Sequence, residues 1–165
     1  MKSASLSLAL AAFALASPAA AAGVVRTPAA SVASPLAAAV TVPGGADLYF
    51  LSGVLAPPDP KGQAGTPAAF GGDTKAQTVA ALTRLQQVLA DLGLGVGDVV
   101  QAHVFLAGDP SNGGDIDFAG LNSGWAQFFG TAAQPNKPAR TTVKAAALVA
   151  PGALVEIEVI AARAK

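Results

Sequence analysis

Apolar residues recur every three or four positions over residues 74–92, which is the spacing of one face of an α-helix. The two residues at the start of this segment that have capping-box spacing are Thr74 and Gln77, and Gly93 stands where the helix must stop. The segment therefore predicts a helix with one buried face. The apolar members of that face are Val79, Leu82, Leu85, Val88, Leu89 and Leu92.

A second helix is predicted over residues 117–129, because large apolar residues again recur at helical spacing. Asp115 or Asp117 can act as its N-cap, since a short carboxylate side chain accepts hydrogen bonds from the first turn. The apolar members are Phe118, Leu121, Trp125, Phe128 and Phe129, which we expect in the core or in an interface.

Strand-forming residues gather in five segments, namely residues 38–42, 47–54, 98–107, 139–148 and 154–162. The turn-rich residues 43–46 link the first two, which we expect to form a hairpin, and Pro151-Gly152 joins the last two as a pair. The order strand, strand, helix, strand, helix, strand, strand indicates an α+β fold. In that fold two helices pack on one face of a mixed sheet.

The first 22 residues are typical of a secretory signal peptide. Met1-Lys2 precedes an apolar stretch over residues 4–16, and the small residues up to Ala22 suit cleavage after that position. The stretch is shorter than the roughly 20 residues that span a bilayer, so an uncleaved anchor or a buried helix is the weaker interpretation. We expect a periplasmic or secreted protein. Residues 23–36 are then a flexible lead-in with room for one short edge strand, and residues 37–165 one domain.

The amino-acid composition argues against several functional classes. Ten Lys and Arg balance ten Asp and Glu, so neither nucleic acid nor an anionic membrane surface is an expected partner. The chain has no cysteine, which excludes a thiol nucleophile and disulfides, and the single His103 makes no metal cluster and is more often structural than a base. Because only 12% of residues are charged, subunit packing is an expected way to cover apolar surface.

The charged residues with the clearest chemical potential are Arg140 and the only glutamates, Glu156 and Glu158. If the runs that carry them are adjacent strands, a guanidinium and a carboxylate meet in one apolar site that suits a small carboxylic acid. Strand alternation places both glutamates on one face. The plainer interpretation makes Arg140 a surface residue and gives Glu158 a solvated or interfacial position.

Several short motifs, in order, resemble the RidA/YjgF family of enamine and imine deaminases. They are Leu51-Ser52-Gly53, the helix with Gln77, Leu92-Gly93 before Val96-Gly97-Asp98-Val99-Val100, residues 118–129 with Asn122, Pro138-Ala139-Arg140, and Val155-Glu156-Ile157-Glu158. The resemblance covers the chain from about Asp47 onward. It implies a chorismate-mutase-like subunit and a homotrimer with three sites in clefts between subunits. It also implies hydrolysis of 2-imino acids without a metal or organic cofactor.

The resemblance also implies roles for individual residues. Arg140 would grip the substrate carboxylate, Glu156 would orient the attacking water, and the pocket would include Ser52, Gly53, Asn122 and backbone groups around Thr142. The family's usual Gly-Pro-Tyr motif is absent, because residues 35–40 contain no tyrosine. A non-enzymatic trimer that binds a carboxylate ligand is therefore the alternative, while the ribonuclease activity of some relatives is disfavoured by the neutral charge.

Overall fold

The computed structural model describes residues 23–31 and 33–165, so the predicted signal peptide lies outside the described residues. Its strands and α-helices are β1 (Val25–Pro28), β2 (Ala37–Thr41), β3 (Asp47–Leu55), α1 (Thr74–Asp91), β4 (Val99–Leu106), α2 (Phe118–Trp125), β5 (Ala139–Lys144) and β6 (Val155–Arg163). Short 3₁₀ helices occur at η1 (Pro67–Phe70), η2 (Val96–Asp98) and η3 (Pro110–Asn112). Within the described ranges, no helix has the length and apolar character needed to cross a membrane.

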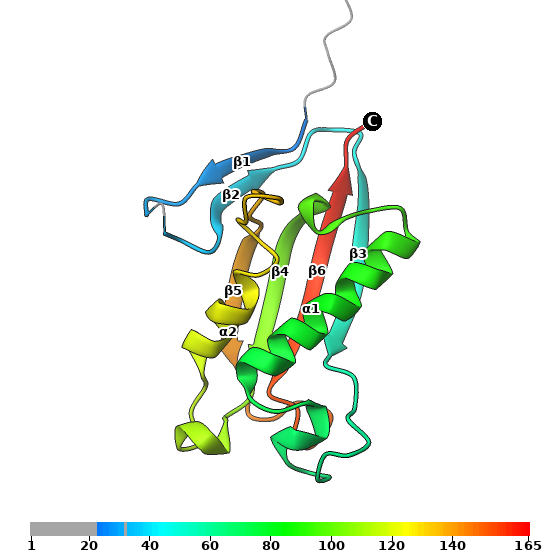
Figure 1. Cartoon of the computed structure of the whole chain (residues 1–165). Coiled ribbons are helices and arrows are strands. Elements are labelled where there is room, and N and C mark those ends of the chain that lie inside the picture. The colour runs from blue at the N-terminus through cyan, green and yellow to red at the C-terminus, as the bar shows by residue number, and fades with distance from the viewer. Residues whose placement is uncertain (1–22, 32) are drawn as a thin grey trace, which may run out of the picture.

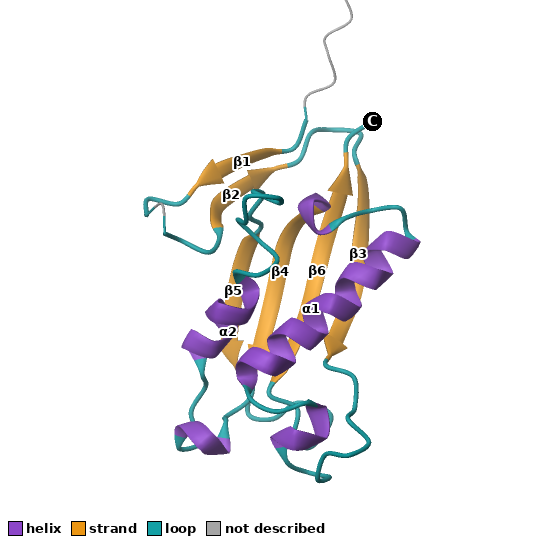
Figure 2. Ribbon diagram, viewed as in Figure 1, coloured by secondary structure: helices purple, strands orange, loops and turns teal. Residues whose placement is uncertain are grey.

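A four-stranded sheet forms one layer, with the strand order β3-β6-β4-β5. Strand β4 is parallel to β5, whereas β6 is antiparallel to both β3 and β4. Helices α1 and α2 both lie across one face of this sheet (Figure 1). Colouring by secondary structure makes the two layers plain, with β1 and β2 as a separate ribbon at one end (Figure 2). The predicted α+β fold, a mixed sheet with two helices on one face, is confirmed.

Two predicted strand pairings are wrong. Strand β2 pairs with β1, the edge strand for which the lead-in left room, and β3 pairs with β6 instead of forming a hairpin with β2. Strand β4 lies between β5 and β6, so the runs that carry Arg140 and Glu156 are not adjacent. The reason is that β6 and β4 bury the most apolar sides and take the central positions, while β5, which carries Arg140 and Lys144, is an edge strand.

Helix α1 begins with a different cap from the predicted one. Asp73 is the N-cap, and its carboxylate accepts a hydrogen bond from the Ala76 N–H at 2.8 Å. Thr74 is buried, so the expected capping box does not form. Gly93 ends the helix as predicted, with a positive φ of 69° that favours glycine.

The buried face of α1 is narrower than the apolar pattern predicts. Leu82, Leu85 and Leu89 lie in the core, whereas Val88 and Leu92 are 38% and 45% exposed. Small and polar side chains complete the buried stripe, which includes Gln77, Thr78 and Ala81. The small side chains let α1 pack closely against α2, where Thr78 lies against Gly124, while the leucines lie in the core.

Helix α2 is capped as predicted and ends earlier than predicted. The Asp117 carboxylate accepts a hydrogen bond from the Gly120 N–H at 2.8 Å, and the last helical residue is Trp125. A turn follows in place of the predicted helix up to residue 129, with the Phe129 N–H donating to the Trp125 carbonyl at 3.2 Å. The rings of these two residues stack with centroids 4.4 Å apart, which keeps both side chains buried.

Gln77 holds two loops together from a fully buried position on α1. Its amide nitrogen donates to the carbonyls of Gly72 at 2.9 Å, Gly152 at 3.1 Å and Pro67 at 3.3 Å. Its amide oxygen accepts from the Leu154 N–H at 2.8 Å. One side chain thus joins the loop before α1 to the loop before β6 and satisfies backbone groups that water does not reach.

Gln77→Leu should lower the free energy of unfolding by about 2–3 kcal/mol, because several buried backbone groups lose their partner. Urea denaturation measures this change. Gln87→Leu on the same helix is the matched control, since Gln87 is exposed and should cost less than about 0.5 kcal/mol. Equal losses in the two variants would contradict the role given to Gln77.

The sheet face opposite the helices is open and largely apolar. Alternation along β4 and β6 buries one side under the helices and leaves half-exposed side chains on the other. Leu48 and Phe50 on β3 share the open side and are 49% and 74% exposed. The open side of the two central strands presents Gln101, His103, Phe105, Glu156, Glu158 and Ile160. An exposed apolar face of this kind is typical of a surface that packs against another protein surface.

Candidate functional site

Arg140 lies on the helix-facing side of β5, beneath α2. Its partner in the parallel register is Ala102 on β4, which belongs to the buried core. Its guanidinium carbon lies 4.7 Å from the centre of the Trp125 ring and 5.7 Å from that of Phe118. Both rings come from α2, so the helix holds the cation against two aromatic surfaces.

The guanidinium of Arg140 donates one hydrogen bond within its own subunit, and two of its buried nitrogen atoms have no hydrogen-bond partner. Nη2 donates to the Asn122 carboxamide oxygen at 2.7 Å. Nε and Nη1 are enclosed and have no acceptor among the described residues. Orphaned buried donors cost free energy unless an acceptor arrives. The group is thus oriented by Asn122 and able to bind an anion with planar geometry.

Burial lowers the pKa of Arg140 to about 10. The cause is desolvation, since the aromatic rings and the helix remove water that would stabilise the charge. A guanidinium with this pKa is still charged at neutral pH. The arrival of a carboxylate would relieve the cost of burying that charge, which favours an anionic ligand at this position.

Thr142 lies two residues further along β5, on the same side of the sheet as Arg140. Its register partner Val104 is a core residue, and its hydroxyl is buried with no partner among the described residues. Three polar atoms that lack partners are therefore held close to one another on one edge strand. We call Arg140, Thr142, Asn122, Phe118 and Trp125 the Arg140 cluster.

Glu156 lies on the open face of the sheet, beside the β-bulge of β3. Its register partners are Phe105 on β4 and Leu55 on β3, and the register of β3 shifts between Leu51 and Val54. A Cβ atom on Gly53 would stand 2.3 Å from Oε1 of Glu156. Only glycine at position 53 leaves room for this carboxylate where it stands, and exposed Ser52 precedes it in the same bulge.

Arg140 and Glu156 face opposite sides of one sheet. Arg140 is aligned with core residue Ala102, whereas Glu156 is aligned with Phe105 three positions further along β4, so alternation turns the two side chains apart. The idea that two adjacent strands bring them together within one subunit is therefore wrong. If both act on one substrate, they must come from different copies of the chain.

Glu158 makes a contact that Glu156 does not. Its Oε1 lies 2.7 Å from Nδ1 of His103, and Nε2 of that histidine lies 2.9 Å from the Gln101 amide nitrogen. These three side chains come from the neighbouring strands β6 and β4 and line the open face. The pair ties the two central strands together across the open face.

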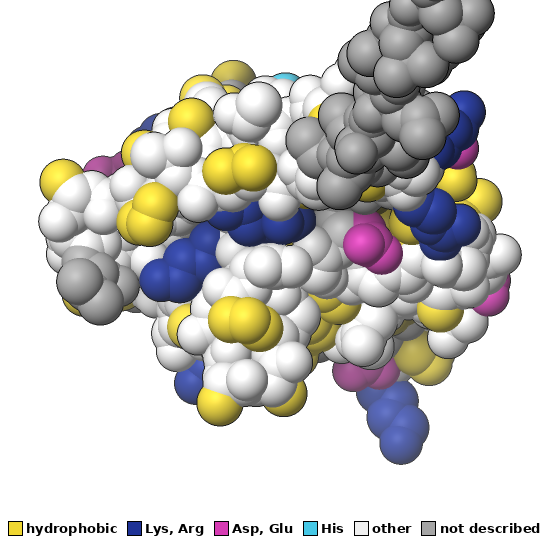
Figure 3. All heavy atoms as spheres, turned by 90° about the horizontal axis from the view of Figure 1, so that it is seen from above, with side chains coloured by type: hydrophobic (Ala, Val, Ile, Leu, Met, Phe, Trp, Pro, Cys, Tyr) yellow, Lys and Arg dark blue, Asp and Glu magenta, His cyan; other side chains and the backbone are white. Residues whose placement is uncertain are grey.

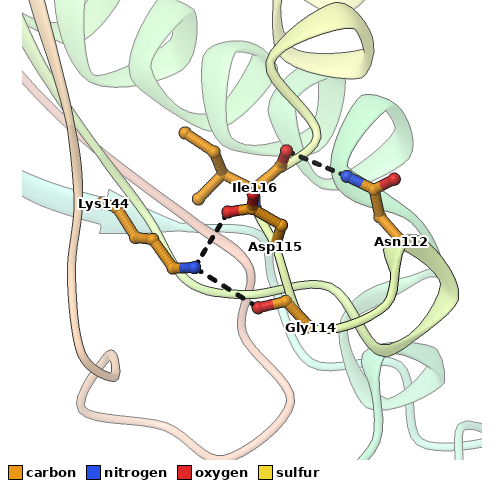
Figure 4. Close-up of polar contacts among 5 residues, drawn as sticks. All are labelled: Asn112, Gly114, Asp115, Ile116 and Lys144. Atoms are coloured by element: carbon orange, nitrogen blue, oxygen red, sulfur yellow. Dashed lines mark hydrogen bonds and ion pairs between the residues drawn. The ribbon is translucent and has the colours of Figure 1, made fainter.

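Lys144, the last residue of β5, anchors the loop that leads into α2. Its ammonium lies 2.8 Å from Asp115 Oδ1 and 3.5 Å from the Gly114 carbonyl, while the Asn112 amide donates to the Ile116 carbonyl at 3.0 Å (Figure 4). The hydrogen bond from Lys144 is the main reason that the pKa of Asp115 is lowered. Since both side chains are exposed, the pair positions the loop and adds little stability.

Sequence patterns indicate Arg140 and Asn122 but miss the aromatic walls of the cluster. Phe118, Asn122 and Trp125 are spaced i, i+4 and i+7, which places all three on one helix face. That spacing was a usable signal, because a polar residue inside an apolar stripe is expected to have a buried partner. Phe118 is also 47% exposed, so it is not simply a core residue.

Gly53→Ala should leave the fold intact and lower activity at a site that uses Glu156, because the added methyl displaces the carboxylate. We expect the rate of a reaction that depends on Glu156 to fall by about tenfold, as for a misplaced catalytic group. Gly95→Ala is the control, since a Cβ there meets no atom within 4 Å. Equal activity in the two variants would show that the position of Glu156 is unimportant.

Among the described residues, no group of three or more His, Cys, Asp or Glu is placed to hold a metal ion. The polar atoms of the Arg140 cluster are donors and a hydroxyl, which suit an anion. The charge and the unpartnered polar atoms of the cluster are chemically compatible with a small anion.

Solved structures share this arrangement of elements. A Rid family protein from Yersinia pestis, YyfB, matches with 22% identity and a TM-score of 0.64, covering 86% of this chain and 100% of its own. A putative endoribonuclease from Thermotoga maritima matches with 27% identity and a TM-score of 0.54, over 84% and 92% of the two chains. The E. coli protein TdcF, solved with bound serine, matches with 28% identity and a TM-score of 0.55, over 84% and 94%.

A family model agrees with these likenesses. The model described as endoribonuclease L-PSP matches residues 29–163, which include every strand and helix from β2 to the end of β6. The match contains both the Arg140 cluster and Glu156. The chain belongs to the endoribonuclease L-PSP family, which is the RidA/YjgF family that its motifs resemble.

Proposed function

We propose that this protein is a homotrimeric hydrolase that converts small 2-imino or enamino acids to 2-oxo acids and ammonia. The observation that carries the proposal is the Arg140 cluster, in which a buried guanidinium presents two N–H groups without acceptors beside the unpartnered Thr142 hydroxyl. A 2-imino acid carries a carboxylate that these donors would satisfy. The structure of TdcF with bound serine supports a small carboxylate ligand for a protein of this fold.

The positions of the two charged groups support a site that is shared between subunits. Since Arg140 and Glu156 face opposite sides of one subunit, a shared site needs the Glu156 of a neighbouring subunit. The exposed apolar side chains of the open face, Phe50 and Leu48 among them, favour packing against other copies. A closed ring of three would repeat the same Arg-to-Glu cleft at each interface.

In the proposed reaction, Arg140 holds the carboxylate and so fixes the imine carbon next to the neighbour's Glu156. The Glu156 carboxylate accepts a proton from water while the water oxygen forms a bond to the imine carbon. The resulting carbinolamine has its amine protonated by the same carboxyl group. The carbon–nitrogen bond then breaks as the hydroxyl group gives its proton to the Glu156 carboxylate, so that ammonia leaves and the carbon–oxygen double bond of the 2-oxo acid forms. Ammonia takes this last proton and departs as ammonium, which restores the carboxylate. An iminium carbon is already electrophilic, so positioning supplies most of the catalysis.

A second candidate function is carboxylate binding without turnover, in the same trimeric cleft. This function is favoured because residues 35–40, which include Leu36, lack the tyrosine that the family's Gly-Pro-Tyr motif supplies. We also propose export, with cleavage after Ala22, which N-terminal sequencing of the protein from the periplasmic fraction would test. An intact Met1 on cytoplasmic protein would contradict it.

The test of the proposed function is imine hydrolysis in a coupled assay. An amino-acid oxidase generates 2-imino acids, and semicarbazide traps those that remain, so an active protein lowers semicarbazone formation and raises ammonia release. We expect concentration-dependent activity from the mature protein. Saturable binding of 2-oxobutanoate without activity would support the binding function, and the absence of both would contradict the two proposals together.

A further inference from the structure

A cavity lies apart from the Arg140 cluster, beneath the β1–β2 ribbon. Its volume is about 460 Å³, within the range of small-molecule sites. Residues from the first strand and the loop after it form one wall, and residues 135–137 form the other. Seen from that end of the molecule, Lys and Arg side chains gather along a hollow in the surface (Figure 3).

The cavity is lined by apolar side chains and two cations. Pro28, Leu36 and Pro135 supply apolar surface, while Arg26 and Lys137 supply positive charge. Neither Asp nor Glu occurs among the described residues that line it. A cavity with this lining suits a ligand that has an apolar body and one anionic group.

Arg26 is held in place by the protein backbone. Its Nη2 donates to the carbonyls of Gly97 at 2.7 Å and Val99 at 3.3 Å, which fixes the guanidinium. Its Nε is buried and has no acceptor among the described residues. Burial lowers the pKa of Arg26, and nearby Asp98 opposes that shift only in part. An anion in the cavity beside the guanidinium would offset part of the cost of burying this charge.

The opposite wall is also fixed. The Lys137 ammonium donates to the Ser34 carbonyl at 2.8 Å, and the Asn136 amide donates to the Gly97 carbonyl at 3.1 Å. The same carbonyl of Gly97 accepts from Arg26, so both walls are tied to one point. A site that is already organised loses little entropy when a ligand binds.

Trp125 packs against the Arg140 guanidinium and does not line this cavity. Its indole N–H donates to the Pro35 carbonyl at 3.1 Å, and the other side of the residue faces the Arg140 guanidinium. Neither Arg140 nor Thr142 lines the cavity beneath the ribbon. A ligand there would be held by a different set of residues from the one that serves the proposed hydrolysis.

We propose that this cavity is a second ligand site, which binds a small organic monocarboxylate with a branched or cyclic apolar body between Arg26, Lys137 and the proline-rich walls. The apolar body fills the space beside Leu36, and the carboxylate accepts hydrogen bonds from Arg26 and Lys137. The site does not depend on the hydrolytic function proposed above.

The test uses 4-methylpentanoate as the probe and is carried out in the Arg140→Met variant, so that the probe does not bind at the Arg140 cluster. Calorimetry should show saturable binding, and the backbone amide signals of Ala29 and Lys137 should shift in NMR spectra. Ala29→Phe, which fills the cavity, should weaken binding at least tenfold. Lys137→Met should weaken the binding of 4-methylpentanoate several-fold and leave the binding of the matched alcohol, 4-methylpentanol, unchanged.

Thermal melts of each variant establish that it is folded. Binding that is equal in Arg140→Met and in Arg140→Met with Ala29→Phe would overturn the proposal, because the ligand would then sit elsewhere. An absence of saturable binding at millimolar probe would also overturn it, as would equal affinity for acid and alcohol. Hydrolytic activity is measured separately, in the chain that keeps Arg140, so the failure of one proposal leaves the other standing.

Discussion

Arg140→Lys should lower kcat/KM for imine hydrolysis by about 10²–10³, because charge-assisted hydrogen bonds to a carboxylate are each worth about 1.5–3 kcal/mol. Lysine keeps the charge but loses the planar fork, and its ammonium cannot take the place of the guanidinium between the Phe118 and Trp125 rings. Binding of 2-oxobutanoate, measured by calorimetry, should weaken in parallel.

Arg84→Lys is the matched control for this substitution. Arg84 is exposed on α1, and the change to lysine should leave both activity and binding unaltered. If Arg140→Lys keeps full activity, the carboxylate is held elsewhere. If urea denaturation shows that Arg140→Lys also loses stability, Asn122→Ala is measured in its place. That substitution removes only the hydrogen bond that orients the guanidinium.

Glu156→Gln should lower kcat by about 10²–10³ while substrate binding changes little, since general base catalysis contributes about 10²–10⁴. The substitution preserves the shape of the side chain beside Gly53 and removes its ability to accept a proton. The expected result therefore separates the two charged residues, with Arg140 acting in binding and Glu156 in chemistry. Steady-state kinetics and calorimetry with 2-oxobutanoate give the two quantities.

Glu158→Gln is the control on the same strand and the same face. Glu158 contacts His103 and takes no part in the proposed reaction, so the variant should retain kcat within a few-fold. A loss equal to that of Glu156→Gln would mean that the two glutamates have been assigned the wrong roles.

Local patterns in the sequence predict both helices and some of the residues at which they begin or end. Asp117 caps α2 and Gly93 ends α1 at the positions that the sequence predicts. Capping and a positive φ depend mainly on neighbouring residues in the sequence. The α1 cap is an exception, since Thr74 is drawn into the core and its neighbour Asp73 takes the role. Burial there outweighs a local motif.

Strand order could not be predicted from the same patterns. The turn at residues 43–46 suggests a hairpin, yet β3 pairs with β6, which is distant in sequence and has the more apolar side to bury. The position of Arg140 under α2 and of Glu156 on the open face depends on the register with β4. Register is a property of the assembled sheet, so the separation of the two residues emerges only with the structure.

The candidate site could be predicted in part. Family motifs single out Arg140, Asn122, Gly53 and Glu156, and the structure places Arg140 beside Asn122 and Glu156 beside Gly53. The role of Phe118 as a wall against the guanidinium was not predicted, because an aromatic residue at helical spacing is most often part of the core.

The most direct test of the account mixes two inactive variants. Arg140→Ala and Glu156→Gln subunits, carrying different tags, are co-expressed so that they assemble at random, and mixed trimers are isolated through both tags. If each site takes Arg140 from one subunit and Glu156 from the next, random assembly gives an intact pair at roughly one quarter of sites. Before selection through the tags, ammonia release should therefore recover to roughly one quarter of the wild-type value, and selected trimers should exceed that. Recovery no greater than that of either variant alone would contradict a site shared between subunits.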